Sequence, residues 1–279
     1  IATAEIKTLL GSTFTYTDTY SPIADDSAFE LRRTVVVSNA DKDDLGFGTR
    51  YSLGILQSQK TRDYYYFAPG AWYKQNEHVP GHAIGHNLDE QYSWYRETRY
   101  ALPLFSMQNI NNGDTVTFCR AKADLKASDV FEKMYDCRTD ASFYYGSLGM
   151  SQPGGLSIDY VYPGTEGYNE EWTPYYRGPY QYQFGFNRRY HPVENGFTQD
   201  YSIVIRFSKN DNFYDMMKDV WRYFYQRFDP KLAPLDNKEL YRVSMELYDD
   251  LCREYYGSWG VPFKCLLPSG EIGIVDYQF

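Results

Sequence analysis

The chain has 279 residues, of which 43 % are apolar and 23 % are charged, so its composition is that of a globular protein rather than a disordered one. Its formal net charge is −9 and its lysines and arginines are scattered, which argues against nucleic acid or an anionic membrane surface as a partner. No stretch approaches the roughly 18 apolar residues that a membrane span needs.

The first two thirds of the sequence consist of expected strands separated by turns. Apolar and polar residues alternate with a period of two in most of these stretches, which is typical of strands with one buried face. Strands are expected at 12–20, 29–39, 51–55, 154–164, 179–191 and 199–211, and 106–122 is expected to form a hairpin that turns at Asn112 and Gly113. Together they predict a large antiparallel β-sandwich domain over residues 1–208.

The periodicity changes near residue 211. Apolar residues then recur alternately three and one positions apart, which predicts an amphipathic helix that begins at Asn212 and ends at Pro230. A second helix is expected from Asp236, which forms a capping box with Glu239, to Gly257.

Residues 209–279 are expected to form a second, helical domain that ends in an apolar tail. Two helices followed by such a tail are typical of the start of an all-helical domain, so we expect the chain to be part of a longer protein. The alternative is that both helices dock on the sandwich and complete it. In either case the predicted fold is mainly β: a large antiparallel β-sandwich followed by a C-terminal α-helical hairpin (α+β overall).

The four cysteines have no C-x-x-C spacing, which disfavours a zinc ribbon. Two disulfides, in any connectivity, and four buried thiols both remain open. These cysteines are Cys119, Cys137, Cys252 and Cys265.

Three of the four histidines, His78, His82 and His86, lie four residues apart, the spacing of metal ligands on one helix face. Pro80 and the glycines around it are incompatible with a helix, so this segment is expected to be a loop without a bound metal. The sequence also has no phosphate-binding loop, dinucleotide fingerprint or G-x-S-x-G elbow, so no cofactor is expected.

The aromatic content is high, with 30 tyrosines in the chain. Strand propensity explains part of it, but tyrosine also suits surfaces that are apolar in the middle and wet at the rim, as carbohydrate-binding surfaces are. Residues 63–100 combine aromatic rings with cationic and acidic groups, and Glu171 and Trp172 offer a further carboxylate and ring. The alternative for both segments is an ordered loop with solvated charges. The residues expected to contact a carbohydrate are Trp72, Tyr73, Lys74, His78, His82, His86, Trp94, Tyr95, Arg96, Glu171 and Trp172.

Two stretches, GAWYKQNEHVPGHAIG at 70–85 and YSWYRETRYALPL at 92–104, resemble a region of large bacterial glycan-degrading proteins of the six-hairpin (α/α) toroid type. The resemblance implies an N-terminal, galactose-mutarotase-like supersandwich followed by the first helices of a catalytic toroid. It also implies that the loop at 72–99 reaches a carbohydrate cleft, that the histidines in it bind by hydrogen bonds or packing, and that the catalytic carboxylates lie beyond this chain.

The function we expect is that of a glycan-processing protein, as the accessory sandwich of a glycoside hydrolase or polysaccharide lyase. Its partners would be an oligo- or polysaccharide and the remainder of the toroid, and it would be exported to the periplasm or cell surface, because polymeric glycans lie outside the cell. One alternative is a stand-alone mutarotase-like sugar epimerase, with His191 as acid and Glu171 or Glu194 as base. Another is a carbohydrate-binding module without catalysis.

Overall fold

The chain divides into two units, Ile1–Asp229 and Pro230–Phe279. In this computed structural model, residues 1–279 are described apart from 24–26, 76–91, 122–136, 153, 166, 169–187, 232–233, 256–257, 261, 267–270 and 276–279.

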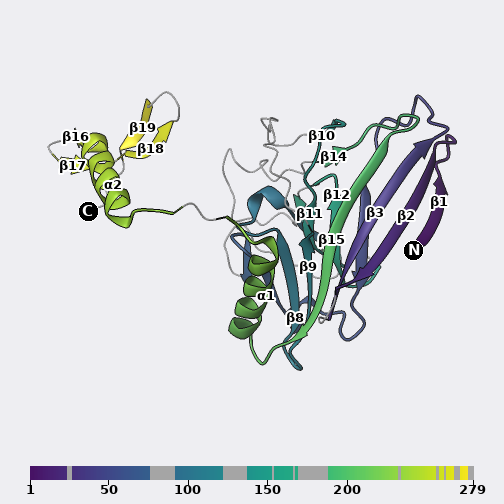
Figure 1. The fold of residues 1–279 in the computed structure, drawn as a ribbon. Coiled ribbons are helices and arrows are strands. Elements are labelled where there is room, and N and C mark those ends of the chain that lie inside the picture. The colour runs from purple at the N-terminus through teal and green to yellow at the C-terminus, as the bar shows by residue number, and fades with distance from the viewer. Residues whose placement is uncertain are drawn as a thin grey trace, which may run out of the picture. The chain divides into compact units, whose positions relative to one another are not determined.

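The larger sheet of the first unit has eight antiparallel strands in the order β1-β2-β3-β15-β9-β8-β5-β6 (Figure 1). These are β1 (Ala2–Lys7), β2 (Thr13–Pro22), β3 (Ala28–Ser38), β5 (Tyr64–Ala68), β6 (Trp72–Lys74), β8 (Leu104–Asn109), β9 (Asp114–Arg120) and β15 (Thr198–Lys209). The strands expected at 12–20, 29–39 and 199–211 are confirmed as β2, β3 and β15. The expected hairpin is confirmed as β8–β9. Gly113 takes a φ of 76° in its turn, a conformation that favours glycine.

The smaller sheet has five antiparallel strands in the order β13-β7-β11-β12-β4. They are β4 (Thr49–Gly54), β7 (Tyr92–Arg96), β11 (Ser147–Ser151), β12 (Ser157–Tyr162) and β13 (Gly167–Tyr168). The strands expected at 51–55 and 154–164 are confirmed as β4 and β12. Of the strand expected at 179–191, the described part is β14 (Arg188–Tyr190), which pairs in parallel with β10 (Cys137–Thr139). Two short 3₁₀ helices, η1 (Thr61–Asp63) and η2 (Glu97–Arg99), lie in the connections.

The two sheets pack face to face around an aromatic core. Alternate residues of β12, namely Ile158, Tyr160 and Tyr162, point towards the larger sheet and pack with residues such as Phe118 and Tyr201. All five side chains are at most 5 % exposed. The period-two pattern reflects one buried face on a strand such as β4, whereas β8, β11 and β12 are buried along their whole length. The mainly β sandwich is confirmed.

The helix α1 (Phe213–Phe228) covers the other face of the larger sheet, where it lies alongside β8 and β9 (Figure 1). Its buried side chains, Phe213, Met216, Val220 and Phe224, recur at helical spacing and pack on Leu104 and its neighbours. Because of this packing α1 belongs to the same unit as the sheets, and the two units divide after Asp229. Cys119 is a buried free thiol in this cluster.

The second unit contains α2 (Asn237–Leu251) and two short antiparallel ladders. The ladders are β16 (Arg253–Tyr255) with β17 (Ser258–Gly260), and β18 (Pro262–Leu266) with β19 (Glu271–Val275). The predicted second helix is confirmed, but its predicted end at Gly257 is wrong: the chain leaves the helix after Leu251 and continues as a strand. Its apolar spacing continues past that point, so periodicity alone did not reveal the end. The toroid stays an expectation.

Candidate functional site

The smaller sheet has a second face, which points away from the core and is lined by small polar residues. We call it the outer face and define it by Arg50 and Ser52 of β4, Trp94 of β7, Gly149 and Ser151 of β11, and Ser157 and Asp159 of β12. Strand pairing aligns Trp94, Gly149, Asp159 and Ser52 in one row across four strands. The side chains of this row therefore share one face of the sheet.

The indole of Trp94 lies across this row. Its Nε1 donates a hydrogen bond of 2.9 Å to Oδ2 of Asp159, although β11 separates the two strands. Both residues pair with Gly149, so the indole spans the position of the glycine. A side chain is excluded at that position, because a Cβ on residue 149 would lie 1.8 Å from the carbonyl oxygen of Ser93. Because Gly149 has no side chain, the indole can lie flat on the backbone of β11.

The carboxylate of Asp159 is fully buried, with 0 % exposure of the residue. Oδ1 accepts a hydrogen bond of 2.8 Å from the hydroxyl of Ser157, and Oδ2 accepts the one from Trp94. No lysine, arginine or histidine of the described residues forms an ion pair with it. Burying a carboxylate is costly unless donors compensate for the lost water, so these two hydrogen bonds stabilise the buried carboxylate, and the one from Trp94 also orients the indole.

Arg50 supplies the exposed charge of the outer face. Its guanidinium lies 5.8 Å from the centroid of the Trp94 ring, and Nη1 donates to the hydroxyl of Ser151 at 3.4 Å. Ser52, on the same strand, is also exposed. The face therefore combines an oriented aromatic ring, a cation and hydroxyls, which are groups that bind a polar ring-shaped ligand. Among the residues that define it there is one carboxylate, whereas hydrolysis of a glycosidic bond needs two.

The structure separates the two aromatic motifs that the sequence analysis grouped together. Trp72 is 3 % exposed and stacks on Tyr66, with ring centroids 4.3 Å apart, so it is a core residue and offers no ring to a ligand. Tyr95 also points inwards and meets Trp72 edge to face. Trp94 and Arg96, on alternate positions of β7, point the other way.

Tyr73 and Lys74 lie on β6, at the edge of the larger sheet, and not beside Trp94. The Tyr73 ring is 44 % exposed and its hydroxyl accepts a hydrogen bond from the backbone N–H of Gly70. Nζ of Lys74 donates to the hydroxyl of Tyr214 on α1 at 3.0 Å and lies 4.4 Å from the centroid of that ring. Lys74 therefore has a structural role, because it attaches the edge of the larger sheet to α1.

The remaining predicted contacts, His78, His82, His86, Glu171 and Trp172, lie outside the described residues. Within the described part, no cluster of three or more histidine, cysteine or acidic side chains could hold a metal ion. No helix in that part is long and apolar enough to cross a membrane.

His191, the acid of the epimerase alternative, is buried with both ring nitrogens engaged. Nδ1 accepts from the amide of Gln199 at 2.9 Å, and Nε2 lies 2.9 Å from the carbonyl oxygen of Phe143, to which it donates. Burial lowers the pKa of the imidazole below its usual value. A neutral ring with both nitrogens bonded inside the protein is unsuited to proton transfer to a ligand.

Sequence reasoning named Trp94 and missed its partners. Asp159 lies in the strand SIDYVY, where Ile158, Tyr160 and Tyr162 face the core and Ser157 and Asp159 must face away. An acidic residue in the middle of such a strand was a usable signal, because carboxylates are rarely buried without a reason. Arg50 carried no comparable signal.

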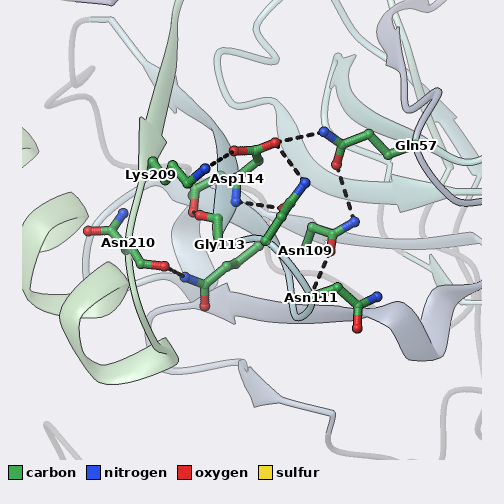
Figure 2. Close-up of polar contacts among 10 residues, drawn as sticks. Gln57, Asn109, Asn111, Gly113, Asp114, Lys209 and Asn210 are labelled. Carbon is green, nitrogen blue, oxygen red and sulfur yellow. Dashed lines mark hydrogen bonds and ion pairs between the residues drawn. The ribbon is translucent and has the colours of Figure 1, made fainter.

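A hollow of about 220 Å³ lies at the edge of the sandwich between β4 and the strands β8, β9 and β15. Its floor is apolar, and Gln57 and Asp114 stand on its rim. Asp114 contacts both Gln57 and Lys209 (Figure 2). Its Oδ2 accepts a hydrogen bond from Gln57 at 2.7 Å and one from Asn112 at 2.8 Å, and its Oδ1 lies 3.8 Å from Nζ of Lys209. Because these rim groups bind one another, the network braces the β8–β9 turn, and the outer face is the stronger candidate site.

Comparison with known proteins gave one distant similarity. No protein-family model matches the chain, and no curated protein matches it. A crystal structure of a "putative aldose 1-epimerase" from Klebsiella pneumoniae subsp. pneumoniae MGH 78578 is similar over 84 % of this chain and 56 % of its own, with 9 % identity and a TM-score of 0.30. The chain thus spans little more than half the length of that structure, and a similarity of this size assigns neither a family nor an activity.

Proposed function

We propose that this chain is the carbohydrate-binding sandwich of a glycan-processing protein and that the outer face is its binding surface. The observation that carries the proposal is the indole of Trp94, fixed across Gly149 by its hydrogen bond to the buried carboxylate of Asp159. An aromatic ring whose orientation is set before the ligand arrives costs little conformational entropy on binding.

Carbohydrate fits this surface better than other ligand classes do. The C–H faces of a sugar ring pack on an aromatic ring, and its hydroxyls need donors and acceptors at the rim. The outer face offers both, through the ring of Trp94 on β7 and through Arg50 and Ser52 on β4. The overall charge of −9 argues against nucleic acid, which would also stack on an aromatic ring.

In this proposal the catalytic residues lie in another domain. A glycoside hydrolase needs a carboxylate on each side of the scissile bond, and the single carboxylate of the outer face, Asp159, is buried under the indole edge. The sandwich would therefore be an accessory part that presents the glycan to a catalytic domain, such as an (α/α) toroid, in an exported protein.

Trp94→Ala tests the proposal. The intact chain should be retained by at least one saccharide on a glycan array. The substitution should weaken binding to that saccharide at least tenfold, about 1.4 kcal/mol, because the stacking surface is lost. Isothermal titration calorimetry measures the change, and near-ultraviolet circular dichroism checks that the sandwich remains folded.

The matched control is Trp221→Ala, which removes a partly exposed tryptophan of α1 on the far side of the larger sheet. The affinity of this variant for the same saccharide should equal that of the intact chain. The proposal is wrong if no saccharide is retained, or if the Trp94 variant binds as tightly as the control.

A further inference from the structure

Arg50 is an exposed cation that forms no ion pair with a carboxylate of the described residues. Its guanidinium has one hydrogen-bond partner among the described residues, the hydroxyl of Ser151, at the long distance of 3.4 Å. Three arginines of the larger sheet differ from it, because each forms an ion pair with a neighbouring aspartate: Arg32 with Asp200, Arg33 with Asp18 and Arg206 with Asp219. The chain has 37 acidic and 28 basic residues, so shortage of acidic groups does not explain the difference.

The carboxylate on the same face does not neutralise this charge. Asp159 pairs with Ser52, two residues along β4 from Arg50, and its side chain is fully buried. Both of its oxygens accept hydrogen bonds, from Ser157 and from Trp94. A ligand that approaches the outer face therefore meets the positive guanidinium, the half-buried ring of Trp94 and the hydroxyl of Ser52, whereas Ser151, Ser157 and the carboxylate are buried.

The backbone at Arg50 is held firmly. Its carbonyl oxygen accepts a hydrogen bond of 3.0 Å from Arg33, which is itself paired with Asp18 at 2.6 Å. Strand β4 is thereby attached to the larger sheet at the residue that carries the exposed charge. The guanidinium is thus presented from a rigid strand, as a binding group should be.

We infer that the outer face binds acidic saccharides, and that Arg50 pairs with the carboxylate or sulfate group of a sugar whose ring stacks on Trp94. The guanidinium lies 5.8 Å from the indole centroid, so one sugar unit can touch both groups. Two parallel N–H groups of an arginine match the two oxygens of such an anion, which makes the pair strong and directional. The inference rests on the proposed function and adds the class of glycan to it.

The experiment compares each acidic saccharide with its neutral counterpart. The carboxylated pair is an oligogalacturonate and its methyl ester, and the sulfated pair is a sulfated galactan oligosaccharide and its desulfated form. Isothermal titration calorimetry at low salt should show that the intact chain binds the acidic member of at least one pair tenfold or more tightly. The pair that shows the preference identifies the anion.

Arg50→Gln should reduce that affinity ratio to about one, and added salt should reduce it in the intact chain. Arg50→Lys, which keeps the charge but not the planar fork, should give an intermediate ratio. The matched control is Arg32→Gln, which removes an exposed arginine on β3 of the larger sheet. The ratio of its affinities for the acidic and the neutral saccharide should equal that of the intact chain.

The outcomes separate the two proposals. If the neutral saccharides bind as tightly as the acidic ones, or if Arg50→Gln keeps the preference, the inference about acidic saccharides is wrong and carbohydrate binding stands. If neither member of either pair binds, and no other saccharide does, both proposals are overturned.

Discussion

Charged and polar side chains inside the sandwich depend on partners that are far away in the sequence. Oε1 of Glu97 accepts hydrogen bonds from the hydroxyl of Tyr160 at 2.5 Å and from the backbone N–H of Gly146 at 2.9 Å, and it lies 3.7 Å from Nη1 of Arg120. Burial raises the pKa of the Tyr160 phenol, so that hydroxyl stays a donor. Asp159 is stabilised by donors from Ser157 and Trp94, with no ion pair to a cation of the described residues. In both cases tertiary contacts compensate for the cost of burial.

His191 makes the stability of the protein depend on pH. Burial lowers the pKa of its imidazole, so the folded protein favours the neutral ring, whereas the unfolded chain takes up a proton near pH 6.5. The free energy of unfolding should therefore fall as the pH drops below that value, by at most about 1.4 kcal/mol per pH unit from this residue.

Urea unfolding at pH 7.5 and pH 5.5, on the intact chain and on His191→Asn, measures this effect. The intact chain should lose more stability than the variant between the two pH values, and the other three histidines are common to both proteins. An equal loss in the two proteins would show that His191 does not titrate on unfolding.

The two helices show how local signals and packing combine in one element. Each begins at a side-chain cap: Oδ1 of Asn212 accepts from the N–H groups of Tyr214 and Asp215, and Oδ1 of Asp236 accepts from those of Lys238 and Glu239. Within the first unit, α1 then buries its apolar stripe against the larger sheet.

Asn212→Ala should lower the free energy of unfolding of the first unit by about 1 kcal/mol, because two backbone N–H groups lose their acceptor. Thermal unfolding followed by the near-ultraviolet signal of the sandwich measures it. Asp236→Ala removes the matching cap of α2 and should leave this transition where it is. Equal shifts in both variants would mean that the two units unfold together.

At the scale of the whole molecule, the first unit owes its integrity to three layers: the smaller sheet, the larger sheet and α1. The helix closes an apolar surface on the larger sheet that includes Leu104, Cys119 and Val204. Each large side chain that α1 buries there stabilises the fold by about 1.5–3 kcal/mol, and four of them approach the total stability of a typical domain.

A chain ending at residue 229 should therefore fold, and a chain ending at residue 208 should not. The longer form should show the sandwich transition of the intact chain by circular dichroism. The shorter form exposes the surface that α1 covers and should aggregate, as measured by light scattering. A soluble, cooperatively unfolding 1–208 chain would contradict the role given to α1.

Much of the fold was predictable because its signals are local. Alternation located β2, β3, β15 and the β8–β9 hairpin of the larger sheet and β4 and β12 of the smaller one, and apolar spacing with caps located both helices. It missed the other strands of both sheets, among them β6 and β7, which lie in the segment 72–99 that was expected to be a loop. The site was only partly predictable: Trp72 and Trp94 occur in the same kind of motif, an aromatic pair followed by a basic residue, and nothing in the sequence distinguishes them. Trp72 faces the core and Trp94 faces away from it, which depends on how each strand joins its sheet.

The sequence by itself determined the two helices and the strands with clear alternation, because these patterns depend on residues a few positions apart. Only the tertiary structure decided which face of each strand is buried, where α1 packs, and that Arg50, Trp94 and Asp159 share one surface. The physical reason is that those contacts join residues more than 40 positions apart, and a strand pattern of period two shows that one face is buried without showing against what.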